Sequence, residues 1–307
     1  MDRDSIDWRG YIPALTTPFD EAGELDAAGV KSLHRWVQGN GVHGFIVLGT
    51  QGEWFNMTTA ERKTLMRLAA EEMAGKLTLI AGCSDYRAHD VLANITEAAN
   101  CGFDGALVTP PPYMKPTERE IYSFYQEVSA GSALPICVYN WPPGTNIDMS
   151  QPLLSELANL ERVVAIKNST PDLGHFFNVL STVGDRVRVF GAPMNELGIS
   201  LVTRHGCAGT MGAGNVLGSD QPDFYNAIWQ GDYEKAKEFG EKDAYLMRAW
   251  FNPDYTGRFG SAQAIFKEAL NQQGLPGGFP RRPLLPLEDP GKSAIKKTLE
   301  QLGKLTP

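Results

Sequence analysis

The chain has 307 residues, of which 42% are hydrophobic and 21% are charged, and its formal net charge is −8 at pH 7. This length and composition predict a globular protein with a sizeable core and exclude wholesale disorder. The excess of acidic residues argues against nucleic acid or an anionic membrane as a partner. No apolar run approaches the roughly 20 residues that a membrane helix needs, and the first residues lack the features of a signal peptide.

The four cysteines are scattered without a Cys-x-x-Cys pair: Cys83, Cys101, Cys137 and Cys207. This spacing excludes a disulfide framework and a zinc knuckle and suits the reducing cytosol, so we expect a soluble cytoplasmic protein. The five histidines show no His-Glu-x-x-His spacing. Because no predicted strand ends in a cluster of carboxylates either, we expect no metal ion.

Strand and helix signals alternate from the N-terminus. Short apolar runs, many of them rich in β-branched residues, predict strands at 11–17, 45–48, 77–81, 105–108, 135–139, 163–167, 187–191 and 207–211. Apolar residues at helical spacing predict helices between them at 30–39, 58–75, 91–102, 117–128, 153–157, 176–180 and 195–205. Asp26 is a candidate N-cap, and Thr58 with Glu61 and Thr117 with Glu120 fit capping boxes.

The succession of eight strands and their helices predicts an α/β protein with a (β/α)8 TIM barrel over residues 1–225. A doubly wound sheet is the alternative, but the regular repeats favour closure. Beyond Asp220 the signals are purely helical, at 232–239, 262–270 and 293–302, with breaks rich in Pro and Gly. We therefore expect a C-terminal helical region, residues 226–307, packed on the barrel.

The sixth predicted strand, Val163–Lys167, consists of apolar residues that lead directly into a lysine. Such a run is typical of a parallel strand buried on both faces, so Lys167 would place an amine at the rim of the core. Burial disfavours the ammonium form, and the neutral amine is a nucleophile towards a carbonyl carbon. The alternative is a lysine that reaches past the strand end into solvent.

Barrel enzymes carry their active sites at the C-terminal ends of the strands. Those ends predict a mouth with hydroxyl groups, glycines and one lysine: Thr16, Thr17, Thr50, Gln51, Glu53, Tyr113, Tyr139, Lys167, Gly191 and Thr210. This set contains no Ser-His-Asp or Cys-His arrangement, and Gly209–Gly214 does not fit the dinucleotide pattern G-x-G-x-x-G. It suits condensation of the lysine with the ketone of a 2-oxo acid, which needs no cofactor.

In that chemistry Lys167 attacks the ketone, and Tyr139 transfers the protons that carbinolamine formation and dehydration require. The amides of the Gly49–Gly52 turn would bind the substrate carboxylate. The iminium then acts as an electron sink, so a bond at the neighbouring carbon can form or break. Each residue also has a structural explanation: Tyr139 as a core tyrosine, Thr50 as turn chemistry and Glu53 as a local cap or ion-pair partner.

Three separated motifs occur in order: Gly49-Thr50-Gln51-Gly52-Glu53, Tyr139-Asn140-Trp141-Pro142 and Ile166-Lys167. Together with Ala14–Phe19 and the Arg-Pro-Leu-Leu-Pro-Leu stretch from Arg282, they resemble the dihydrodipicolinate synthase / N-acetylneuraminate lyase family over nearly the whole chain. The resemblance implies a (β/α)8 barrel with a C-terminal helical region, assembled as a homotetramer that is a dimer of dimers. It also implies a class I lyase that acts on a pyruvate-type 2-oxo acid.

By this resemblance Lys167 is the Schiff-base lysine, Tyr139 the proton-transfer tyrosine and Thr50 part of the hydroxyl relay. Tyr113 is the nearest candidate for the relay tyrosine that family members contribute across the dimer interface. We expect five residues to bind the substrate: Gln51, Gly191, Thr210, Tyr113 and Trp141. Of these, Trp141 would contact the second half of the substrate.

Two departures from the family pattern narrow the reaction. Gln51 stands where members usually have Thr or Ser, and Gly144 stands where dihydrodipicolinate synthases carry an arginine that binds the carboxylate of the aldehyde substrate. Loss of that clamp argues against 4-hydroxy-tetrahydrodipicolinate synthase, which joins pyruvate and aspartate semialdehyde. We expect instead an aldol cleavage or condensation, or dehydration of a 2-keto-3-deoxy acid. A barrel that binds a 2-oxo acid without turnover is the alternative from another class.

Overall fold

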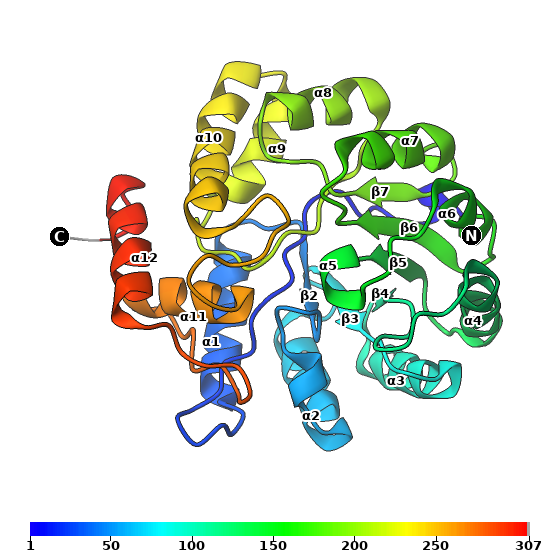
Figure 1. Ribbon diagram of the computed structural model, residues 1–307, viewed down its shortest axis with the longest axis horizontal. Helices are drawn as coiled ribbons and strands as arrows, with labels where there is room; N and C mark the ends of the chain where they lie inside the picture. The colour runs from blue at the N-terminus through cyan, green and yellow to red at the C-terminus, as the bar shows by residue number, and fades with distance from the viewer. Residues whose placement is uncertain (306–307) are drawn as a thin grey trace.

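The computed structural model describes residues 1–305, and within them eight strands form a parallel barrel surrounded by helices (Figure 1). The strands are β1 (Gly10–Tyr11), β2 (Gly44–Val47), β3 (Thr78–Gly82), β4 (Gly105–Val108), β5 (Ile136–Asn140), β6 (Val163–Asn168), β7 (Arg188–Phe190) and β8 (Gly209–Thr210). Their order is β1-β8-β7-β6-β5-β4-β3-β2, and Ala14 closes the ring by bridging to both Ile46 and Ala213. The predicted (β/α)8 barrel is confirmed, and the doubly wound alternative is excluded.

The barrel helices are α1 (Ala27–Gly39), α2 (Thr59–Met73), α3 (Ala88–Cys101), α4 (Glu118–Gly131), α6 (Gln151–Leu157), α7 (Leu173–Val183), α8 (Glu196–His205) and α9 (Asp220–Gln230). Six of these eight helices begin after a residue whose side chain caps the helix, the exceptions being α3 and α9. Asp26 accepts a hydrogen bond from the Gly29 amide, and both predicted capping boxes are present. Three short elements were not predicted: η1 (Arg3–Ser5), η2 (Trp54–Asn56) and α5 (Pro142–Thr145).

The first predicted strand, 11–17, is much shorter in the structure. Only Gly10–Tyr11 forms β1, and beyond it only Ala14 makes bridges. Pro13 and Pro18 have no amide proton to donate to a ladder, which explains why regular pairing stops. The segment after β1 still forms hydrogen bonds with β2. The Leu15 amide donates to the Ile46 carbonyl, and the Ile46 amide donates to the Pro13 carbonyl.

The barrel interior is filled by side chains that alternate with those facing the helices. Ile12, Ile46, Ile80, Leu107 and Phe190 are among the members of this inner cluster. Trp8 joins the cluster near the N-terminal ends of the strands, where a Cβ at Gly105 would lie 2.1 Å from its indole ring. With the interior packed, a ligand has access only to the C-terminal mouth.

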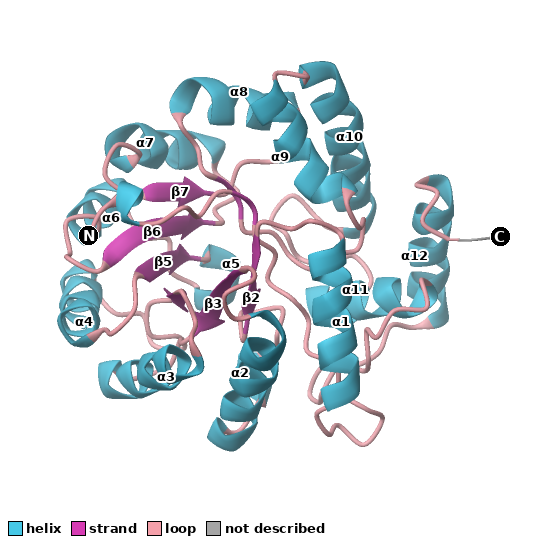
Figure 2. Cartoon of the chain, turned by 180° about the vertical axis from the view of Figure 1, so that it is seen from behind, coloured by secondary structure: helices cyan, strands magenta, loops and turns pink. Residues whose placement is uncertain are grey.

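The C-terminal region consists of α10 (Tyr233–Trp250), α11 (Ala262–Gln272) and α12 (Asp289–Gln301), which lie on one side of the barrel (Figure 2). Asp220, at the start of α9, forms ion pairs with Lys242 at 2.7 Å and with Lys304 at 2.6 Å, which ties α9, α10 and the chain after α12 together. The predicted boundary after residue 225 falls within α9. Residues 306–307 of the predicted region lie outside the described residues.

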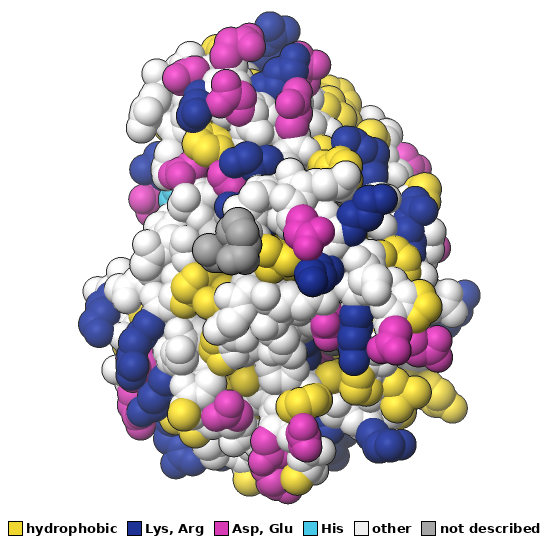
Figure 3. Space-filling model, turned by 90° about the vertical axis from the view of Figure 1, so that its left-hand side faces the viewer, with side chains coloured by type: hydrophobic (Ala, Val, Ile, Leu, Met, Phe, Trp, Pro, Cys, Tyr) yellow, Lys and Arg dark blue, Asp and Glu magenta, His cyan; other side chains and the backbone are white. Residues whose placement is uncertain are grey.

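The outer surface of the C-terminal side carries both signs of charge. Figure 3 shows the side of the molecule on which α12 lies, with acidic and basic side chains interspersed among apolar ones. None of the described helices combines the length and apolar character that a membrane span requires.

A buried ion pair links the turn after β2 to α11. Glu53 and Lys267 have side chains that are 0% and 1% exposed, and Lys267 Nζ lies 2.5 Å from Glu53 Oε1. The backbone amide of Arg281 donates to the second oxygen of Glu53 at 3.0 Å. Glu53 adopts a left-handed φ of 56°, which is strained for a residue with a side chain. Glu53 is therefore an ion-pair partner, as one of the structural explanations expected. Its partner, however, is more than 200 residues away in the sequence and not a local residue.

Removal of one partner should destabilise the protein strongly. Lys267→Met leaves the Glu53 carboxylate buried and uncompensated, so we expect the free energy of unfolding in urea to fall by roughly 3–5 kcal/mol. The double variant Glu53→Gln, Lys267→Met removes both charges and should recover part of that loss. Lys235→Met, which breaks an exposed pair with Glu238, is the control and should leave stability nearly unchanged. A loss in Lys267→Met no larger than in the control would contradict this account.

Candidate active site

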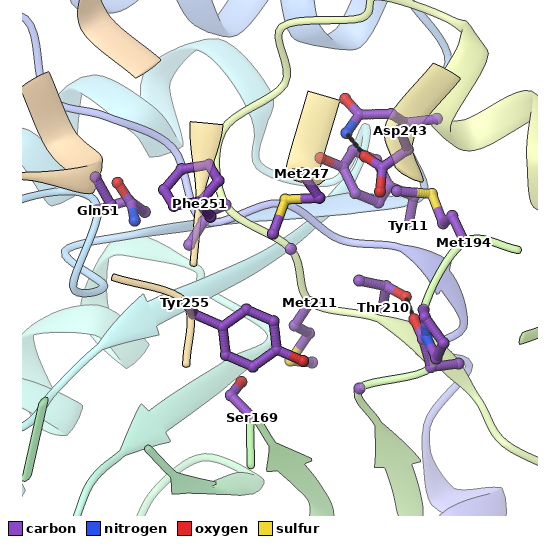
Figure 4. Close-up of a pocket in the computed structure, with 18 of the residues that line it drawn as sticks. Tyr11, Gln51, Ser169, Met194, Thr210, Met211, Asp243, Met247, Phe251 and Tyr255 are labelled. Carbon is purple, nitrogen blue, oxygen red and sulfur yellow. Dashed lines mark hydrogen bonds between the residues drawn. The ribbon is translucent and has the colours of Figure 1, made fainter. Parts of the chain in front are cut away.

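A cavity of about 370 Å³ lies at the C-terminal end of the barrel. Strand ends and the loops after them form one wall, and α10 with the segment that follows it forms the other (Figure 4). Seven of the eight predicted site residues line this cavity: Thr50, Gln51, Tyr139, Trp141, Lys167, Gly191 and Thr210.

Lys167 is the buried amine of the cavity. It is directly paired with Tyr139 across β5 and β6, is 5% exposed, and has its Nζ 4.1 Å from the centroid of the Tyr139 ring. Burial lowers the pKa of Lys167 to about 8, and no carboxylate among the described residues opposes that shift. Nearby Cys137 is held as a neutral thiol, because burial raises its pKa to about 12. A substantial fraction of Lys167 is therefore neutral near pH 8.

Tyr139 is the second buried group, and it stays a protonated phenol. Burial raises its pKa, while hydrogen bonds with Thr50 and Ser169 act in the opposite direction. A phenol that contacts two hydroxyl groups beside a neutral amine can pass a proton in either direction. Ser169 was not predicted, although its position two residues after Lys167 on an extended chain places it on the same face.

The turn after β2 presents polar groups to the cavity. Thr17 Oγ1 donates to the Gly52 carbonyl at 2.8 Å, and Gln263 Nε2 of α11 donates to the Thr50 carbonyl at 2.9 Å, so the turn is fixed from two sides. Within residues 1–305 the backbone amides of Thr50 and Gln51 have no backbone acceptor. Such free amides, next to the Gln51 carboxamide, are suited to binding a carboxylate.

Three aromatic rings stack at the opening of the cavity. The Trp141 ring centroid lies 6.2 Å from those of both Tyr139 and Tyr255, with interplanar angles of 21° and 30°. Gly144, in α5, faces this stack, because a Cβ at that position would lie 2.2 Å from Trp141 Nε1. The indole thus occupies the space into which a side chain at position 144 would extend.

Gly191 and Thr210 border the cavity on the side of β7 and β8. Gly191 has a φ of 140°, and a Cβ there would lie 2.4 Å from the Asn168 carbonyl oxygen, so this position requires glycine. Thr210 Oγ1 lies 2.5 Å from the hydroxyl of Tyr225 and also donates to the Ala192 carbonyl.

The remaining predicted strand-end residues lie outside the cavity. Tyr113 is 97% exposed, with a φ of 77°, on the loop after β4, so its suggested reach into a neighbouring subunit stays a prediction. Thr17 and Glu53 hold the turn after β2, and Thr16 is buried elsewhere. In residues 1–305, no three His, Cys, Asp or Glu side chains gather in an arrangement that could hold a metal ion.

Comparison with known proteins identifies the family. The model of the dihydrodipicolinate synthetase family matches residues 7–302. The chain belongs to this family, and it is a lyase.

Relatives of this family match the chain along nearly its whole length. A DapA-like lyase of Rhizobium meliloti, itself uncharacterized, is 32% identical over 301 residues, which are 98% of each chain. A 4-hydroxy-tetrahydrodipicolinate synthase of Phenylobacterium zucineum is 30% identical over 297 residues, 96% of this chain and 98% of the relative. The solved dihydrodipicolinate synthase of Thermotoga maritima has a TM-score of 0.87 at 28% identity, covering 98% of this chain and 100% of that one.

The contact between Gly144 and Trp141 can be tested in this family member by a single methyl group. Gly144→Ala should push the indole out of its stack, which changes the near-ultraviolet circular dichroism and lowers the free energy of unfolding by about 1–3 kcal/mol. Gly39→Ala in α1 is the matched control, because a Cβ there meets nothing within 4 Å. It should leave the spectrum unchanged and raise stability by up to about 1 kcal/mol. Identical spectra for wild type and Gly144→Ala would refute the contact.

Proposed function

We propose that the protein is a class I lyase in which Lys167 forms a Schiff base with a pyruvate-type 2-oxo acid. The observation that carries the proposal is the buried Lys167 amine, which has a pKa lowered to about 8 and lies 4.1 Å from the Tyr139 ring centroid. An amine that is neutral at mild pH, next to a phenol and two hydroxyl groups, has what imine formation needs. The family membership supports the same class of reaction.

The proposed reaction starts with attack of Lys167 Nζ on the ketone carbon, which gives a carbinolamine. Tyr139, hydrogen-bonded to Thr50 and Ser169, delivers a proton to the departing hydroxyl group, so that water leaves and the iminium forms. In cleavage, the electron pair of the C3–C4 bond moves into the iminium, the C4 hydroxyl proton passes to the Tyr139 phenolate, and an aldehyde leaves; Tyr139 then protonates the resulting enamine at C3. In condensation, the phenolate removes a C3 proton instead, the enamine attacks the aldehyde, and the new alkoxide takes the proton back. Hydrolysis of the final iminium by one water molecule returns the amine and releases the product.

The substrate carboxylate would lie against the turn after β2. The amides of Thr50 and Gln51 have no backbone acceptor within residues 1–305, and both residues line the cavity. This arrangement supports a carboxylate bound next to the ketone carbon that Lys167 attacks.

Gly144 favours a 2-keto-3-deoxy acid over aspartate semialdehyde as the substrate. Several relatives are 4-hydroxy-tetrahydrodipicolinate synthases, but in this chain a side chain at position 144 would collide with Trp141. Position 144 therefore carries no guanidinium group, and the aromatic surface of Trp141 lies there instead. We propose aldol cleavage, aldol condensation or dehydration of such an acid. Coupled assays with 2-keto-3-deoxy sugar acids, aspartate semialdehyde and N-acetylneuraminate will choose among these reactions.

We also propose assembly as a homotetramer built from two dimers. Tyr113 and Met114 on the loop after β4 are 97% and 57% exposed, and adjacent exposed apolar side chains are typical of a contact surface. A cytoplasmic location remains a prediction.

Borohydride reduction tests the Schiff base directly. With pyruvate present, we expect a covalent adduct on the peptide that contains Lys167, detected by mass spectrometry, and no adduct in Lys167→Ala. The initial rate of adduct formation should rise as pH increases through about 8. The neutral amine is the nucleophile, and it predominates at pH values above the pKa of Lys167. Binding of pyruvate without an adduct would instead support the barrel that binds without turnover.

Tyr139→Phe removes the proposed proton carrier and preserves the ring. We expect the rate of adduct formation to fall on the order of 10²-fold or more, measured by quenching with borohydride at successive times. Tyr125→Phe is the control, because Tyr125 is another buried tyrosine, and its hydroxyl donates to the Val108 carbonyl at 2.7 Å, outside the cavity. It should lower stability but not the rate. A wild-type rate in Tyr139→Phe would remove this residue from the mechanism.

A further inference from the structure

The cavity is larger than a pyruvate-type acid requires. Its volume of about 370 Å³ corresponds to roughly a dozen water-sized groups at about 30 Å³ each, whereas pyruvate has six non-hydrogen atoms. Lys167 lies at β6, and β8 is two strands further along the order β6-β7-β8, roughly 10 Å away at the spacing of neighbouring strands. The cavity thus extends from the amine to a second, distal end.

Asp243 of α10 supplies the polar group at that distal end. Figure 4 shows it beside Tyr11, on the side of the cavity away from Ser169 and Tyr255. Gln221 Nε2 donates to Asp243 Oδ1 at 2.9 Å. The second carboxylate oxygen has no hydrogen-bond or ion-pair partner within residues 1–305. Burial raises the pKa of Asp243 to about 6, so at neutral pH the group is mainly a carboxylate that still lacks one donor.

The neighbouring groups do not provide that donor. Tyr11 donates its hydroxyl to the Gly214 carbonyl at 2.5 Å, and the hydroxyl of Tyr225 lies 2.5 Å from Thr210 Oγ1. Burial raises the pKa of both tyrosines, and the charge of Asp243 adds to that shift. Lys242, the residue before Asp243, is paired with Asp220 at 2.7 Å.

Apolar side chains form much of the cavity wall around this polar group. Figure 4 shows Met194 and Met247 beside it, and Met211 and Phe251 line the cavity further away. An incompletely paired carboxylate in such surroundings favours a ligand group that donates a hydrogen bond. An apolar chain would leave the carboxylate desolvated without compensation.

We propose that Asp243, held by Gln221, is a specificity-determining residue that accepts a hydrogen bond from a hydroxyl group at the distal end of the substrate. The proposal rests on the Schiff-base function, which places the 2-oxo acid end of the same substrate at Lys167. It therefore names the substrate class as a 2-oxo acid whose chain continues for several carbons and carries hydroxyl groups.

Two six-carbon acids test the proposal by the same borohydride reaction. 2-Keto-3-deoxygluconate carries hydroxyl groups at its distal carbons, and 2-oxohexanoate has the same length without them. The concentration that gives half-maximal trapping, with intact and pyruvate adducts counted together, should be at least about tenfold lower for the hydroxylated acid. Asp243→Leu should remove most of that ratio, and Asp243→Asn, which keeps the shape and one acceptor, should remove less.

Glu241→Leu is the matched control, because Glu241 is an acidic residue of the same helix that does not line the cavity, and it should keep the wild-type ratio. No preference for the hydroxylated acid in the wild type, or an unchanged ratio in Asp243→Leu, would overturn the proposal. If Asp243→Leu does not fold, the Asp243→Asn ratio decides.

Failure of the Schiff-base function is recognised separately. Wild-type protein that leaves no adduct with pyruvate refutes the chemistry at Lys167 and not the distal site. Calorimetric titration of wild type and Asp243→Asn with the same two acids then decides whether Asp243 selects the hydroxylated ligand.

Discussion

The desolvation of the Lys167 amine is the physical constraint on which the proposed chemistry depends. A lysine in water is protonated far above neutral pH, and an ammonium ion cannot attack a ketone. All six residues of β6 are buried, and the lysine near its end has an aromatic ring and a neutral thiol as neighbours rather than a carboxylate. The barrel thus stabilises the neutral form by withholding the usual ion-pair partner.

The C-terminal helical region completes the site that the barrel begins. α11 holds the turn after β2 through Gln263 and through the buried pair between Lys267 and Glu53. α10 and the segment after it contribute Asp243 and Tyr255 to the opposite wall. Without this region the turn would keep only the hydrogen bond from Thr17, and the cavity would be open on one side, so the two parts of the chain act as one structural unit.

The barrel could be predicted from sequence because its determinants are local. Buried parallel strands are short apolar runs, and caps such as Thr58 and Thr117 define helix starts within a few residues. The location of Lys167 and Tyr139 in the cavity could be predicted because each stands at the end of a predicted strand, at the end of the barrel where active sites lie. The helix α9 could not, because its first residues, Asp220, Gln221 and Pro222, are buried despite being polar or helix-breaking.

The cavity wall formed by α10 and the segment after it depends on contacts between segments that are distant in the sequence. Asp243 lies on a helix that the apolar pattern predicted only to residue 239, and Tyr255 lies in a loop with no recognisable motif. The sequence shows only that position 144 is a glycine and not an arginine. The structure adds that a side chain there would collide with the indole of Trp141. Such relations need three-dimensional proximity and cannot be read from spacing.

The most direct test of the central claim is the titration of Lys167 itself. Protein carrying 13C at lysine Cε, with the Lys167 resonance assigned by its loss in Lys167→Arg, would be followed by NMR from neutral to alkaline pH. The desolvated amine predicts a midpoint near the lowered pKa of about 8, against an ordinary value of 10.5. A midpoint at the ordinary value would mean that the amine is solvated and protonated, and it would contradict the account.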